Sequence, residues 1–420
     1  MIYIAIVISL LFLALAINTK KLNMIVFNLV WIASLAINSV CYDVIDEPSE
    51  KASLFILLFV FSVNIGALVT RRVSGISFHG SNTTEVDYSV NIKKFLVLNL
   101  AVTVYFVFKY TVKSYRITSE YGLIFTRIYA YTSDEAYFGS TLDLYIAQHI
   151  IYAFFYSSMI IGITRMVKGG QKHGWINFIG ILQMLLFSYT FKGRSAIISV
   201  ILYLLAAVYI RFNKNSTNVD ISQKRKIVKR IRPIVIFIGI YLVILSLSRF
   251  GGTSQLKKFF IIYFGGSVTY FSKLVDIAKI RYEPGFFSLC GIVDFFKLAL
   301  SVVFGLKLDM GGNVIGSYID GATNIGAGLS INAMCSAPFY FYLEFGIIGI
   351  LVLGFFLGSV SSMLQRRYSN RPSSINTVLY LLILYTLIYT YSGWSLKYLY
   401  FWLVPFIIKL YSDKEFSSNN

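Results

Sequence analysis

The stretch Ala52–Thr70, ASLFILLFVFSVNIGALVT, runs for nineteen residues without a charged side chain. A helix that crosses a lipid bilayer needs about 20 mostly apolar residues, so this stretch predicts a membrane-spanning helix. Charged residues lie on both sides of it, Glu50 and Lys51 before and Arg71 and Arg72 after. The apolar run therefore has charged residues at both ends, as membrane-spanning helices commonly do.

The composition of the whole chain agrees with a lipid environment. Its 420 residues are 57% hydrophobic and 14% charged, and the mean hydropathy is +0.70, whereas a soluble domain is about one quarter charged. A soluble fold has no room to bury this much apolar surface, which excludes a disordered chain, a disulfide scaffold and a cytosolic enzyme. The three cysteines, Cys41, Cys290 and Cys335, show no CxxC spacing and are expected to be small apolar fillers.

The same apolar pattern recurs along the chain and predicts an all-α, polytopic membrane protein. The eleven predicted spans are 2–18, 24–41, 52–70, 95–112, 141–163, 174–190, 195–210, 233–248, 339–363, 375–392 and 397–411. We divide the chain into a first transmembrane bundle at 1–248, which includes an outer loop at 113–140, a large outer loop at 249–338, and a second bundle with a short cytoplasmic tail at 339–420.

The basic residues decide the predicted orientation because cytoplasmic loops retain Lys and Arg. With the amino terminus outside, the cytoplasmic segments hold 22 of the 38 basic residues but only 5 of the 19 acidic ones. These segments are 19–23, 71–94, 164–173, 211–232, 364–374 and the tail from Lys409. The strongest run, Lys224–Arg232, is expected to anchor on anionic lipid. The net charge of +19 is therefore a topology signal and predicts no nucleic-acid partner.

The large outer loop contains two semi-apolar pieces, Phe259–Val275 and Phe286–Phe304, which charged residues interrupt. Such pieces are typical of helices that lie in the membrane interface, so we expect both there. The stretch Gly311–Gly328 is rich in Gly, Asn and Ser and predicts an exposed loop of the kind that carries functional sites.

Several common chemistries lack their motifs. The chain has no Walker loop, GxGxxG, HExxH or GxSxG, so nucleotide-driven pumping, dinucleotide chemistry and the common hydrolases lose support. His79, His149 and His173 are too scattered for a metal site, and we expect neither metal nor cofactor. His149 falls in the outer half of a span, where it is either functional or hydrogen-bonded between helices.

Basic residues at the outer membrane edge are the first candidate site, because the positive-inside rule disfavours them there. Lys192 and Arg194 flank Gly193 in a short outer turn, and Arg249 lies at the outer end of a later span. Such turns present guanidinium and ammonium donors to a phosphate; the alternative is snorkelling to the interface. Four more basic residues either widen this basic region or are solvated surface charges: Lys257, Lys258, Lys279 and Arg281.

The second candidate site lies where a polar outer loop enters a long apolar helix. From Asn332 through Pro338 the chain reaches Glu344, which has no basic residue within four positions. A carboxylate in such a run is protonated, paired across helices or exposed to a water-filled cavity. Glu344 is therefore a candidate, with pairing to an outer arginine as the alternative, and Asp320 is a second choice.

These residues together resemble a known family. Lys192-Gly193-Arg194 in a short outer turn, the large late loop and the pattern N-x5-P-x5-E-F-G-x-x-G from Asn332 to Gly349 are similar to bacterial oligosaccharide repeat-unit polymerases of the O-antigen polymerase (Wzy) type. The resemblance implies a GT-C-like bundle of about 11–12 spans in the bacterial inner membrane. Members of the family usually have both termini in the cytoplasm, which implies one span beyond the eleven.

The resemblance also implies a function. Such enzymes are metal-independent glycosyltransferases that move a glycan from its undecaprenyl pyrophosphate carrier onto another carrier-linked repeat unit at the periplasmic face. They build O-antigen, a component of lipopolysaccharide, or capsule, beside a flippase and a chain-length regulator. The family's arginines engage pyrophosphates, a role carried here to Arg194 and Arg249. Glu344 would accept the proton or orient the acceptor, and Asn332 stands where related ligases have a histidine, which favours a polymerase.

Two other functions stay open. A flippase or transporter of lipid-linked oligosaccharides would need charged residues along a path through the membrane midplane, whereas this sequence keeps its charges near the ends of spans. An O-antigen ligase would transfer the glycan to the lipid A core instead of to another carrier.

Overall fold

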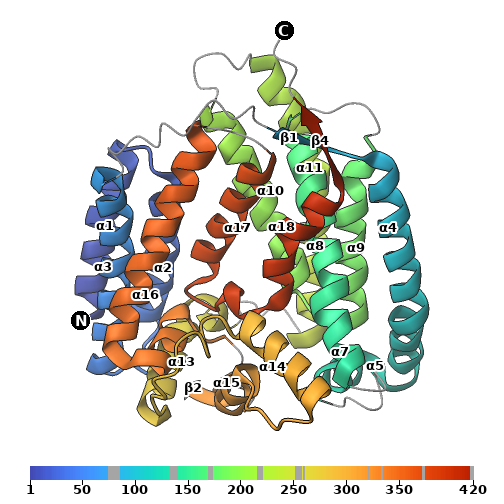
Figure 1. The fold of residues 1–420 in the computed structure, drawn as a ribbon. Helices are drawn as coiled ribbons and strands as arrows, with labels where there is room; N and C mark the ends of the chain where they lie inside the picture. The colour runs from blue at the N-terminus through green and yellow to red at the C-terminus, as the bar shows by residue number, and fades with distance from the viewer. Residues whose placement is uncertain are drawn as a thin grey trace. The chain divides into compact units, whose positions relative to one another are not determined.

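The computed structural model describes residues 1–73, 86–132, 141–168, 174–214, 221–250, 258, 261–319, 321–332, 334–370 and 374–416. Of these described residues, 81% are helical (Figure 1). It forms two compact units, each assembled from segments that are distant in sequence. The first unit comprises 1–83, 254–372 and 382–399, and the second comprises 84–253, 373–381 and 400–420. The predicted division by membrane topology stays a prediction.

The first unit contains four long helices, several short ones and a small hairpin. Its elements are α1 (Ile2–Asn18), α2 (Leu22–Val40), α3 (Glu50–Val73), η3 (Ile261–Gly265), α13 (Gly266–Ile277), α14 (Cys290–Phe304), α15 (Gly311–Ile319), β2 (Thr323–Gly326), β3 (Leu329–Ile331), α16 (Ala337–Asn370), η4 (Ser395–Lys397) and the second half of α17 (Ser374–Tyr389). Strands β2 and β3 pair antiparallel.

The second unit is a helical bundle with one pair of strands. Its elements are β1 (Val86–Val90), α4 (Ile92–Phe106), η1 (Val107–Thr111), α5 (Val112–Thr132), α7 (Thr141–Tyr145), η2 (Ile146–Ile151), α8 (Tyr152–Lys168), α9 (Ile176–Phe191), α10 (Ser195–Lys214), α11 (Ile221–Phe250), the first half of α17, α18 (Leu399–Leu410) and β4 (Ser412–Phe416). Strand β1 pairs antiparallel with β4.

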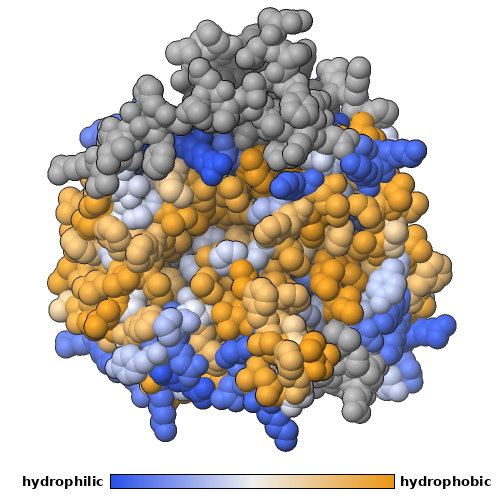
Figure 2. Space-filling view, viewed as in Figure 1, coloured by the Kyte–Doolittle hydropathy of each residue, from blue (hydrophilic) through white to orange (hydrophobic). Residues whose placement is uncertain are grey.

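Each of the predicted spans falls mainly on one helix or on two or three consecutive helical elements. Five helices of the described chain are long and apolar enough to cross a membrane: Leu22–Val40, Glu50–Thr70, Ile92–Gly122, Asp143–Met166 and Ala337–Asn370. The shorter apolar helices are Ile2–Asn18, Ile176–Phe191, Ser195–Tyr209, Ile231–Ile244, Ile375–Tyr389 and Leu399–Leu410. Apolar residues cover much of the described surface on the face shown in Figure 2, and many large apolar side chains of the described residues are exposed. The predicted helical fold is confirmed, and the long apolar helices indicate a membrane protein.

Glycines allow α3 and α16 to pack closely in the first unit (Figure 1). A Cβ atom added to Gly66 would lie 2.0 Å from the carbonyl oxygen of Phe355, and one added to Gly358 would lie 1.9 Å from that of Val63. Small residues of this kind let helix backbones approach in membranes, where packing drives association. The contact therefore depends on the absence of side chains at these positions.

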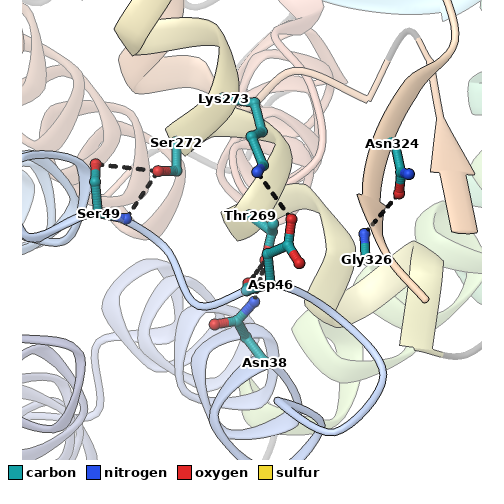
Figure 3. Close-up of polar contacts among 8 residues, drawn as sticks. All are labelled: Asn38, Asp46, Ser49, Thr269, Ser272, Lys273, Asn324 and Gly326. Carbon is teal, nitrogen blue, oxygen red and sulfur yellow. Dashed lines mark hydrogen bonds and ion pairs between the residues drawn. The ribbon is translucent and has the colours of Figure 1, made fainter. Parts of the chain in front are cut away.

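The loop between α2 and α3 is fixed to α13 by hydrogen bonds (Figure 3). Asn38 Nδ2 donates to Thr269 Oγ1 at 2.9 Å, and this hydroxyl donates to the carbonyl oxygen of Asp46 at 2.8 Å. The amide of Ser49 donates to Ser272 Oγ at 2.8 Å. This loop and α13 therefore lie at the same end of the first unit.

Helix α13 is packed against other elements of the first unit. Nine of its residues, Gly266 through Ser272 with Leu274 and Val275, are buried within the first unit. Its small polar residues make close contacts with α2 and its loop, so the helix belongs to the core of the first unit. The predicted placement of Phe259–Val275 in the membrane interface stays a prediction. By contrast, α14 exposes Phe296 by 62% and Val302 by 76%, which fits the predicted placement of Phe286–Phe304.

A group of basic residues lies where the start of α2 meets the last turns of α3 and α16. Lys21 Nζ donates to the carbonyl oxygen of Ala67 at 2.9 Å, and Ser362 Oγ donates to the same oxygen at 3.0 Å. The start of α2 and the last turns of α3 and α16 therefore meet there. These segments contain Lys20, Lys21, Arg71, Arg72, Arg366 and Arg367. The loop at the α13 end instead contains Asp43, Asp46 and Glu47.

Candidate functional site

The turn between α9 and α10 is tight because Lys192 adopts a left-handed backbone conformation, with φ of 51°. This conformation ends α9 and brings Gly193 back onto the helix. The amide of Gly193 donates to the carbonyl oxygen of Ser188 at 3.2 Å, and Ser188 Oγ donates to that of Gly193 at 2.5 Å. The side chains on either side of Gly193 are thereby held on a short, fixed backbone.

Both basic side chains of this turn are buried in the second unit. Lys192 is 2% exposed and Arg194 is 6% exposed. The Lys192 ammonium lies 3.7 Å from the centroid of the Tyr189 ring, and burial lowers the pKa of Lys192 to about 8. Snorkelling places a charged head in water and does not fit side chains this buried. One turn thus holds two buried basic side chains.

Neighbouring helices hold the end of α9 in place. Thr190 Oγ1 lies 2.9 Å from Thr111 Oγ1, and Ser114 Oγ donates to the carbonyl oxygen of Thr190 at 2.8 Å. Thr111 is the last residue of the π-helical turn η1, where Lys109 forms an ion pair with Asp143. Because π-helical turns are frequent at functional sites, the surroundings of the basic turn agree with its selection as a candidate.

The other predicted basic residues are placed less tightly. Arg249 lies in the last turn of α11, in the second unit with Lys192 and Arg194; only its backbone is described. Lys258, Lys279 and Arg281 are exposed, which fits the alternative that they are surface charges. Four residues considered in the sequence analysis lie outside the described chain: Lys257, Asp320, His79 and His173.

Glu344 is buried in α16 at 1% exposure, and its carboxylate accepts three hydrogen bonds. The amides of Phe287 and Ser288 donate to Oε1 at 2.9 and 2.6 Å, and Ser288 Oγ donates to Oε2 at 3.2 Å. Backbone amides thus take the place of the arginine partner that was the alternative. Because such charge-assisted bonds are strong, Glu344 fastens residues 287–288 to α16; its role as proton acceptor stays a prediction.

Helix α16 breaks immediately after Glu344. Phe345 has φ of −141° and Gly346 has φ of 61°, a region that glycine enters at little cost. The carbonyl oxygen of Leu343 accepts a hydrogen bond from the amide of Arg281 at 3.0 Å. The break thus turns a helical acceptor outward to the 281–288 segment. The Glu-Phe-Gly part of the motif therefore has a structural role in joining this segment to α16.

Asn332, the second predicted catalytic residue, lies just after β3 and is exposed. It belongs to the first unit, as does Glu344. The structure therefore brings Lys192 and Arg194 together in one turn of the second unit, and places Asn332 and Glu344 on segments of the first.

Sequence reasoning missed Lys397, which lies in η4 before α18. Its Nζ donates to the hydroxyl of Tyr340 at 2.8 Å and lies 4.8 Å from the ring centroid of Tyr398. In the same loop, Trp394 Nε1 donates to the carbonyl oxygen of Ser288 at 2.6 Å. The loop thus contacts the segment that Glu344 binds. The available signal was a lysine at the outer end of the last predicted span, where positive charge is disfavoured.

His149 lies in the π-helical turn η2, with its ring centroid 4.4 Å from that of Tyr145. Its Nδ1 atom is buried and has no hydrogen-bond partner within the described chain. The predicted hydrogen bond between helices is therefore not formed by this atom. No group of three His, Cys, Asp or Glu side chains among the described residues is placed to hold a metal ion.

Comparisons of the chain with protein-family models, with curated proteins and with solved structures found no match. The residues and their geometry are therefore the basis for a functional assignment.

Proposed function

We propose that the chain is a bacterial inner-membrane polymerase that joins undecaprenyl-pyrophosphate-linked oligosaccharide units into a surface polysaccharide at the outer leaflet. The observation that supports the proposal most directly is the burial of Lys192 and Arg194 in one tight turn between two apolar helices. A turn of this kind suits the phosphates of a lipid carrier, because the carrier's chain stays in the membrane while its head group reaches the membrane edge. A GT-C-like bundle is part of the proposal.

The proposed reaction is a displacement at the anomeric carbon of the donor glycan. A hydroxyl of the acceptor sugar forms the new glycosidic bond, the bond to the carrier's pyrophosphate breaks, and the hydroxyl proton passes to a base. Negative charge develops on the departing pyrophosphate, and cations fixed in a low-dielectric environment stabilise such charge. Arg194 would supply a bidentate guanidinium and Lys192 an ammonium, with Arg249 as a further contact.

Glu344 has a positioning role in this proposal. Its hydrogen bonds to the amides of Phe287 and Ser288 fasten the 281–288 segment to α16 and so support a fixed surface for the acceptor. Fixed surfaces of this type lower the barrier by holding the reacting groups close together. Asn332 lies on an exposed segment before α16, where it would contact the sugar.

Purified protein in liposomes with carrier-linked oligosaccharides tests the proposal. Carrier-bound chains of two or more repeat units are expected from a polymerase, without nucleotide sugar. A flippase would move the substrate across the bilayer without lengthening it. A ligase would lengthen nothing until lipid A core is added. Unchanged chain length with active, folded protein would reject the proposed function.

The role of Arg194 is tested in the same assay. Arg194→Ala is expected to lower the polymerisation rate by about 10²–10³-fold, the usual cost of removing one stabilising donor. Arg194→Lys is expected to rescue poorly, because an ammonium does not reproduce the bidentate fork. Arg367→Ala, at an exposed arginine of α16, is the matched control and should keep the wild-type rate. Wild-type activity in folded Arg194→Ala would remove this residue from the mechanism.

A further inference from the structure

We propose that Lys397 binds an oxyanion of the substrate, either a phosphate of a carrier lipid or a carboxylate of an acidic sugar. This inference rests on the proposed function for the identity of the substrate, but its geometry belongs to the first unit alone. The basic turn of Lys192 and Arg194 belongs to the second unit. Each unit would then hold one anion-binding position.

The Lys397 ammonium is held by tyrosines. Its Nζ lies 2.8 Å from the Tyr340 hydroxyl, 5.3 Å from the centroid of that ring and 4.8 Å from the centroid of Tyr398. Tyr340 is fully buried, at 0% exposure, whereas Lys397 is partly exposed. Tyr340 is thus a positioning residue on α16 for this ammonium.

Charge balance points to an anionic ligand. Among the described residues, no carboxylate lies within 4.0 Å of Lys397 Nζ, and the nearby Glu344 directs its oxygens to Phe287 and Ser288. An ammonium has three N–H donors, of which the Tyr340 hydroxyl accepts one. A partly buried cation with two donors left is stabilised by an oxyanion.

The backbone around Lys397 is closely packed against α14, which suits a binding position. A Cβ added to Gly291 would lie 2.7 Å from the carbonyl oxygen of Lys397 and 2.6 Å from the amide nitrogen of Leu399. The thiol of Cys290 also lies 3.5 Å from the carbonyl oxygen of Lys397. The start of α14 therefore packs directly on η4 and fixes the segment that carries the lysine.

The proposed reaction needs a second anion-binding position of the kind that Lys397 would provide. A polymerase handles a donor and an acceptor at once, and each is attached to a pyrophosphate. A second cation is then needed for the second carrier, unless the sugar itself carries the negative charge. The partly exposed Tyr398 ring beside the cation would also pack against a sugar or a prenyl chain.

Amine footprinting of the wild-type protein tests the inference without a variant. The full chain in phosphatidylcholine nanodiscs is treated with an amine-acetylating reagent, alone, with undecaprenyl pyrophosphate, or with oligogalacturonate. Mass spectrometry then follows Lys397 and, as the control, exposed Lys307. We expect Lys397 acetylation to slow by at least about fivefold with one of the two anions, as occupancy of the site requires, while Lys307 is unchanged.

The two arms distinguish the source of the oxyanion. Protection by the pyrophosphate alone assigns the site to the carrier, and protection by oligogalacturonate alone assigns it to an acidic sugar. A second measurement uses Lys397→Gln, which should bind the protecting anion at least about tenfold more weakly, as the loss of one charge-assisted contact predicts, with Lys307→Gln as its control. Tyr340→Phe should weaken binding less, because it leaves the charge in place.

Failure here is distinct from failure of the proposed function. Equal acetylation of Lys397 with and without both anions, in protein that lengthens carrier-bound chains, overturns this inference alone. Protection of Lys397 in protein that lengthens nothing leaves the anion site in place and rejects the polymerase.

Discussion

Burial of Lys192 gives the proposed anion site a pH dependence. Because burial lowers the pKa of Lys192 to about 8, this side chain is mostly charged at about pH 7 and mostly neutral at about pH 9, whereas an unperturbed lysine titrates near 10.4. We expect the affinity for undecaprenyl pyrophosphate to fall as the pH rises through about 8. Titrations of wild-type protein between about pH 6.5 and 9.5 measure this midpoint.

The matched variant for this prediction is Lys192→Arg. A guanidinium stays charged over the whole range, so its affinity should stay level where the wild type loses affinity. Lys307→Arg, at an exposed lysine, should keep the wild-type profile. The same midpoint in Lys192→Arg as in the wild type would assign the titration to another group.

A variant of Glu344 distinguishes its positioning role from a role as proton acceptor. Glu344→Gln keeps one oxygen but replaces the other with an NH2 group that cannot accept from Ser288 Oγ, and it removes the charge that strengthens the bonds from the Phe287 and Ser288 amides. Since hydrogen bonds to a charged group are worth about 1.5–3 kcal/mol, we expect a loss of stability of this order. Thermal unfolding in detergent measures it.

The control for Glu344 is Glu283→Gln, an exposed carboxylate of the same segment, which should unfold like the wild type. A Glu344→Gln protein with unchanged stability and no polymerisation would instead identify the carboxylate as the base. Loss of stability therefore indicates the positioning role, and loss of polymerisation at unchanged stability indicates the base.

At the scale of residues, local geometry could be predicted, but contacts between distant residues could not. The turn from Lys192 to Arg194 could be predicted because its residues are adjacent and one of them is glycine. The burial of Glu344 followed from the apolar run around it, but its partners did not, since Phe287 and Ser288 are 57 and 56 residues away. Lys397 was missed for the same reason: Tyr340, which holds it, is 57 residues distant.

At the scale of helices, the length of an apolar run predicted where in the chain a helix lies but not which residues surround that helix. The predicted spans coincide with helices because about 20 apolar residues have no other stable arrangement in lipid. The segment of α13 also has apolar residues, yet its Ser and Thr side chains bond to the α2–α3 loop and draw it into the core. The break at Gly346 could not be predicted either, because a glycine within a helical run can continue the helix, end it or interrupt it.

The contact between α3 and α16 makes a prediction for Gly358. Gly358→Ala places a methyl group 1.9 Å from the carbonyl oxygen of Val63, so the two helices must separate. Overpacking of this type costs about 1–3 kcal/mol, and we expect a lower unfolding temperature in detergent. Gly239→Ala, in α11 with nothing within 4 Å of the added Cβ, is the control and should be neutral or slightly stabilising. Equal stability of the two variants would mean that α3 and α16 pack less closely than described.

For the whole molecule, the sequence could predict that the chain is helical and apolar. Composition and apolar run length report these features because both depend on the surrounding solvent. The orientation predicted from loop charge stays a prediction. The grouping of distant segments into two units depends on contacts that leave no periodic signal, so it could not be predicted.

Orientation is the property of the whole chain on which the proposed chemistry depends. The substrate is presented in the outer leaflet, so the turn at Lys192 must face outward, and the other end of α9 must face the cytoplasm. Trp175 and Ser195 are exposed residues at these two ends. In a background with Cys41, Cys290 and Cys335 replaced, we expect a membrane-impermeant maleimide to label Ser195→Cys in intact cells, and Trp175→Cys only after permeabilisation. The reverse pattern would place the basic turn beside the cytosolic nucleotide pool and exclude a polymerase fed from the outer leaflet.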